Sequence, residues 1–110
     1  MLSTAIALFA IAILIGIILL TLFLMDGKTP PTLSRIHGGI AIIALLLVIL
    51  SVALYGSVPQ IAGMSVLIIA ALLGLRLFIL GRKNKQFPKW LPLLHALIAA
   101  VGFFLLLISL

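Results

Sequence analysis

The sequence predicts an all-α membrane protein: an up-down-up-down bundle of four transmembrane helices that contains an internal two-helix duplication. Three observations support this fold class. Of the 110 residues, 66% are hydrophobic and 7% are charged, with a mean hydropathy of +1.59, which is far too apolar for a soluble protein of this size. The apolar residues form four long runs, and the second half of the chain repeats the first.

Each of the four runs reaches the length of about 20 mostly apolar residues that a spanning helix needs. We predict spans at Leu2–Met25, Leu33–Tyr55, Gln60–Leu80 and Trp90–Leu110. The first run differs from a secretory signal because it has no basic start and its apolar core is too long. We therefore expect it to remain as the first span.

The polar residues are concentrated in three short connections, Asp26–Thr32, Gly56–Pro59 and Gly81–Lys89. Short links between spanning helices force consecutive helices to run antiparallel. Almost nothing remains outside the spans, so residues 1–110 are predicted to form a single transmembrane domain.

An internal repeat relates the two halves. Shifting the sequence by 58 residues places Leu8–Val52 on Val66–Leu110 without a gap. Matches between apolar residues arise easily by chance in such a chain. Four identical pairs of other residue types in the same frame do not: Gly16/Gly74, Pro30/Pro88, His37/His95 and Ser51/Ser109. We interpret this as a duplication, with repeat 1 at about residues 1–56 and repeat 2 at about 57–110. The halves should then be related by a pseudo-two-fold axis along the membrane normal.

The positive charges predict the orientation. All seven Lys and Arg residues lie in or near the first and third connections, and the positive-inside rule places these connections in the cytoplasm and both termini outside. The net charge of +6 is thus foremost a topology signal, with attraction to anionic lipid or an acidic partner as a secondary interpretation. Nucleic acid is an improbable partner, because no soluble surface is available to bind it.

His37 and His95 are the candidate metal ligands. Each lies seven residues after a proline, Pro30 or Pro88, that we expect to open the second or fourth span. That spacing is about 10 Å along a helix, between the cytoplasmic interface and the midplane. The second and fourth helices should be diagonal in the bundle, with axes roughly 11–14 Å apart. Two inward imidazoles would leave room for a metal with a flat macrocycle, which favours one bis-histidine haem b.

Other interpretations of the histidines stay open. A lone His near a helix end is more often interfacial or hydrogen-bonded than a ligand. Zinc usually takes three or four protein ligands, whereas copper is not ruled out. The chain has no cysteine, which excludes thiolate sites and covalently attached c-type haem.

Five further residues are candidates for contact with the cofactor. Three of them are glycines that could leave space for the edge of a haem ring: Gly16, Gly74 and Gly38. Close helix packing explains such glycines equally well. Arg76 lies inside the third span, where an arginine usually faces a partner or a polar cavity. A haem propionate would supply that partner, with Arg35 as a second candidate, and snorkelling to the interface is the alternative.

The first half also carries a recognisable motif. The segment Gly27–Leu33, then His37-Gly38 and Ala41, resembles the signature of small, poorly characterised bacterial four-span membrane proteins, with Gly-Lys-x-Pro-Pro, a Leu and then His-Gly. The second half keeps one of the two prolines and has Ala96 after its histidine. This resemblance implies a multi-pass protein of the bacterial inner (plasma) membrane. The paired histidines are similar in arrangement to the axial ligands of b-type membrane cytochromes, which implies electron transfer if haem is present.

We therefore expect an electron-transfer protein that exchanges electrons with a quinone or a partner redox subunit. The alternative is a cofactor-free structural or accessory subunit of a larger respiratory or photosynthetic membrane complex. The spans contain no carboxylate for proton-coupled drug export, because the one acidic residue is Asp26 in the first connection. No nucleophile with a neighbouring base is present either, which argues against hydrolytic or transferase chemistry.

Overall fold

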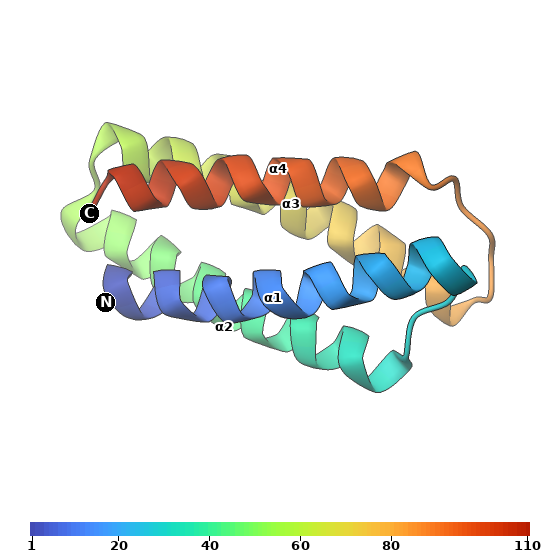
Figure 1. Cartoon of the computed structure of the whole chain (residues 1–110). Coiled ribbons are helices and arrows are strands. Elements are labelled where there is room, and N and C mark those ends of the chain that lie inside the picture. Colours follow the sequence, from blue (N-terminus) through green and yellow to red (C-terminus); the bar gives the residue numbers. More distant parts are fainter.

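A computed structural model describes residues 1–110, with the exception of the Asp26 side chain. It contains four α-helices: α1 (Leu2–Asp26), α2 (Pro31–Tyr55), α3 (Val58–Arg82) and α4 (Trp90–Ile108). All four are long and apolar enough to cross a membrane, which confirms the prediction of an all-helical protein with four apolar helices. The molecule measures 42 × 22 × 20 Å, and both termini lie at one end of its long axis (Figure 1).

The helix starts differ from the expectation at both prolines. Pro30 does not open α2 but caps it in an extended conformation, with φ −62° and ψ 128°, because the residue before a proline is disfavoured in the helical region. Pro31 takes the first helical position instead. Pro88 likewise lies before α4, which begins at Trp90, while Pro92 lies in the first turn of that helix, where its missing N–H has no intrahelical acceptor.

The four helices are arranged as two hairpins. α1 packs most extensively on α2 and α3 on α4, and sparser contacts join α2 to α3 and α1 to α4. Helices α2 and α4 are therefore diagonal in the bundle. Figure 1 shows the α1–α2 hairpin and the α3–α4 hairpin side by side.

The hydrophobic core lies toward the end that carries the termini. Its fully or nearly buried members come from all four helices: Ala5, Ile6, Phe9, Ala44, Val48, Leu67 and Leu106. Glycines allow α3 and α4 to approach closely here, since a Cβ added at Gly102 would lie 2.6 Å from Leu67 Cγ. The large apolar side chains on the outside of the bundle are exposed, as expected of surfaces that face hydrocarbon.

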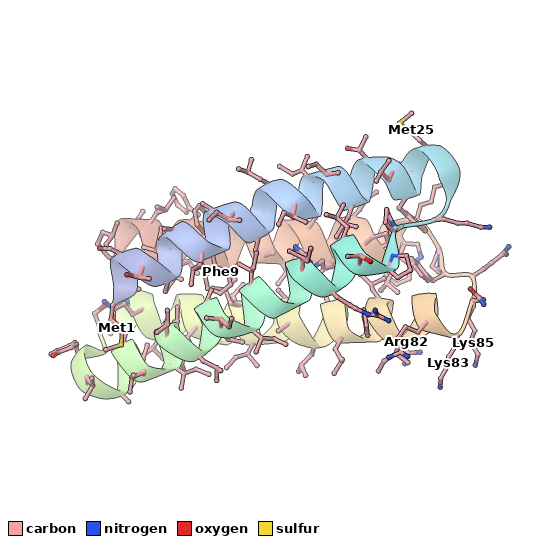
Figure 2. The ribbon with its side chains drawn as sticks, turned by 90° about the horizontal axis from the view of Figure 1, so that it is seen from below. Met1, Phe9, Met25, Arg82, Lys83 and Lys85 are labelled. Carbon is pink, nitrogen blue, oxygen red and sulfur yellow. The ribbon has the colours of Figure 1, made fainter. Side chains whose placement is uncertain are left out.

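The opposite end is basic. Arg82, Lys83 and Lys85 gather at the end of α3, far from Met1 (Figure 2). The third connection covers the end of α1, because Phe87 stacks on Phe23 with ring centroids 4.9 Å apart and an interplanar angle of 12°. The two histidines lie between this basic end and the core.

Candidate functional site

A backbone carbonyl on α1 orients His37. The Nδ1 atom of His37 lies 2.8 Å from the carbonyl oxygen of Ala12. A carbonyl only accepts hydrogen bonds, so Nδ1 donates and the neutral ring keeps the lone pair on Nε2. One turn further along α1, a Cβ added at Gly16 would lie 3.0 Å from His37 Cε1. The ring is thus held between a carbonyl and a glycine of the neighbouring helix.

His95 is held in the same way by the second hairpin. Its Nδ1 atom lies 2.8 Å from the carbonyl oxygen of Ala70 on α3. A Cβ added at Gly74 would lie 2.9 Å from His95 Cε1. The histidine, the alanine and the glycine of this hairpin each stand 58 positions after their counterparts in the first hairpin.

The two imidazoles lie next to each other across the boundary between the hairpins. Their centroids are 6.3 Å apart and their planes are inclined by 83°. Two imidazoles bound on opposite sides of one metal ion through bonds of about 2.1 Å have ring centres about 6–6.5 Å apart. The observed separation of the rings therefore matches that of two ligands on a single ion.

A small apolar cavity of about 60 Å³ lies beside the two rings. All four helices contribute to its walls, and five of its lining residues are alanines: Ala12, Ala41, Ala70, Ala71 and Ala99. Pockets for organic ligands have volumes of about 300 Å³ or more. The cavity is therefore too small for a macrocycle, which would require the hairpins to lie further apart along their alanine-lined faces.

The predicted glycines lie in different surroundings from one another. Gly16 and Gly74 are in contact with the histidine rings, so they provide space for the rings themselves. Gly38 follows His37 on α2 but has no atom within 4 Å of an added Cβ. It does not line the cavity.

The two predicted arginines lie outside the cavity lining. Arg35 is exposed on α2, and its position two residues before His37 turns it by about 200° around the helix axis, toward the opposite side. Arg76 is exposed on α3, where it lines a separate groove with Lys83 and Lys85. The structure thus brings the two histidines together, with neither arginine beside them.

The described residues contain no group of three or more His, Cys, Asp or Glu side chains that could hold a metal ion. Any metal between the histidines would therefore take its remaining ligands from a macrocycle, from water or from another molecule. The sequence did not predict that the carbonyl groups of Ala12 and Ala70 bind the histidines, because a main-chain acceptor has no signature in the side-chain pattern. Their identity in the repeat frame is the one signal that marks them.

No family model, curated protein or solved structure matches this chain.

Proposed function

We propose that the protein binds one b-type haem through His37 and His95 and transfers electrons to or from a quinone or a neighbouring redox subunit. The observation that carries this proposal is the pair of imidazole rings from diagonal helices, with centroids 6.3 Å apart. Each ring also has its Nδ1 committed to a backbone carbonyl. Two neutral Nε2 donors are a ligand set that makes haem iron six-coordinate.

The hydrogen bonds to Ala12 and Ala70 have a definite role in this proposal. An acceptor that binds the N–H of the other ring nitrogen fixes the tautomer and orientation of a ligating histidine and increases its basicity. Backbone carbonyls of packed helices are rigid acceptors, so each ring is held in place within its own hairpin, and the hairpins must move apart to admit a haem. The alanine walls keep polar groups and water away from the centre. A bound haem would supply one-electron chemistry there.

The same proposal includes the up-down-up-down topology and the internal duplication. Buried positions agree in the repeat frame, with Ala5/Gly63, Phe9/Leu67, Ala12/Ala70, Ala44/Gly102 and Val48/Leu106 all buried. Two equivalent hairpins give each histidine the same environment, which suits symmetric axial ligation. The basic end of the bundle faces the cytoplasm of a bacterium in this proposal, with the histidines in the leaflet nearer to it.

Haem content tests the proposal. The protein is expressed in cells supplied with ample haem, purified in mild detergent, and its haem is quantified against protein concentration. We expect about one haem per chain. Folded, helical protein with no haem would contradict the cytochrome function.

The small cavity favours a second candidate, a cofactor-free structural or accessory subunit of a larger membrane complex. A volume of about 60 Å³ is well below that of a ligand pocket, and the bundle offers apolar faces all round to neighbouring spans. In that case the purified protein would contain neither haem nor copper. The two histidines would then pack the hairpins together through their carbonyl hydrogen bonds.

A further inference from the structure

We propose that the groove on the outer face of α3 binds the phosphate group of an anionic phospholipid. The groove has a volume of about 270 Å³ and is lined by Leu72, Leu75, Arg76, Ile79, Leu80, Lys83 and Lys85. Five of these seven residues recur every three or four positions along α3, and Lys83 continues the same face at the C-cap. Aliphatic side chains and three cations thus share a single surface.

The depth of Arg76 favours an anionic partner. Arg76 lies six residues before the end of α3, which is about 9 Å along the axis, so its side chain leaves the backbone within the span. A charge at this depth is costly unless it is paired or reaches the interface. The groove continues from Arg76 toward Lys83 and Lys85, so a phosphate at the interface would be within the reach of all three side chains.

The end of α3 is folded so that Lys85 returns to this groove. Asn84 adopts a left-handed conformation with φ 53°, the Asn84 N–H donates to the Gly81 carbonyl, and the Lys85 N–H donates to the Leu80 carbonyl. This pair of bonds is a Schellman motif, which reverses the chain at a helix end. It places Lys85 beside Leu80 on the groove and satisfies two carbonyls that would otherwise repel an anion.

The charges of the groove favour an anion. The C-terminus of a helix carries about half a negative charge, whereas the groove carries three formal positive charges. Arg82 is excluded from it, because its guanidinium lies over the Phe78 ring, 5.8 Å from the centroid. The floor of Leu72, Leu75 and Ile79 is apolar and suits an acyl chain, so a membrane lipid fits the groove better than free phosphate does.

Lipid retention in native mass spectrometry tests this assignment. The protein is released from a non-ionic detergent in the presence of equal amounts of phosphatidylglycerol and phosphatidylcholine. We expect the wild type to retain one phosphatidylglycerol in preference to phosphatidylcholine. The Arg76→Gln/Lys85→Gln variant should bind phosphatidylglycerol about tenfold more weakly or worse, because each basic residue near a lipid surface contributes about 1 kcal/mol.

The matched control is Arg82→Gln/Lys89→Gln, which removes one arginine and one lysine from the same end of the molecule but none from the groove. It should retain the preference for phosphatidylglycerol. Arg76→Lys, which keeps the charge, should also retain it, and helicity by circular dichroism establishes that each variant is folded. Equal losses in the two double variants, or equal retention of both lipids by the wild type, would overturn the proposal.

Discussion

The imidazole of His95 rests directly on Gly74, so closely that a methyl group at Gly74 would lie 2.9 Å from Cε1. His37 rests on Gly16 in the same way at 3.0 Å. Contacts below 3.0 Å force a shift, and the ring cannot rotate freely because its Nδ1 is bound to a carbonyl on the same helix as the glycine. The glycine and the carbonyl together therefore set the position of each ring.

We expect Gly74→Ala to displace the His95 ring and weaken the cofactor site. Changes next to a ligating histidine reduce metal affinity by about 10- to 100-fold, and we expect haem affinity to fall by about tenfold in a titration. The displacement should also change the imidazole NMR signals of His95 in protein without any cofactor. That second measurement tests the contact itself, independently of haem.

Gly38→Ala is the control, since an added Cβ there meets no atom within 4 Å. It should leave both the haem affinity and the imidazole signals as in the wild type. Equal effects of Gly38→Ala and Gly74→Ala would mean that the glycine contact does not position the ring.

Leu106 supports the core between the hairpins. It is 0% exposed, and a Cβ added at Gly63 would lie 2.9 Å from its Cδ2. We expect Leu106→Ala to reduce the free energy of unfolding by about 1–3 kcal/mol, somewhat less than in a soluble core, because hydrocarbon outside the bundle is equally apolar. Reversible unfolding in a denaturing detergent, followed by circular dichroism, measures this change.

Leu97 on the same helix is 64% exposed and provides the comparison. Leu97→Ala should change the free energy of unfolding by less than about 0.5 kcal/mol. A larger effect at Leu97 than at Leu106 would contradict the placement of the core.

The orientation in the membrane can be tested separately from the site. A reporter enzyme that is active only in the periplasm should work when fused after Leu110 and should be silent when inserted near Asn84, because the basic connections are expected in the cytoplasm. The reverse pattern would place the basic end and the groove on α3 in the outer leaflet.

Hydropathy sufficed to predict the four helices, because spanning segments must be long and apolar. The helix starts were less predictable: Pro30 lies one residue and Pro88 two residues before the helix that follows it. At Pro30 the cause is Pro31, because a proline disfavours the helical conformation of the residue before it. Periodicity could not show that Ala5 is fully buried whereas Leu14 is 63% exposed, because nearly every position is apolar.

The part of the candidate site that could be predicted is the set of residues that are identical in the two repeats. The repeat frame picked out His37 and His95, which the structure brings within 6.3 Å. It also marked Gly16 and Gly74, but as possible space for a ring and not as the surfaces on which the histidines pack. Arg76 could not be placed from the sequence, because the groove it lines depends on the chain reversal at Asn84.

The visible absorption spectrum of the reduced protein and its single histidine variants tests the central proposal most directly. If His37 and His95 are the two axial ligands of one iron, the wild type should give the sharp bands of a low-spin b-type haem. His37→Ala and His95→Ala should each abolish this six-coordinate spectrum to a similar extent, since the two rings have equivalent partners. A low-spin spectrum that survives either substitution, or folded wild-type protein without haem bands, would contradict the proposal.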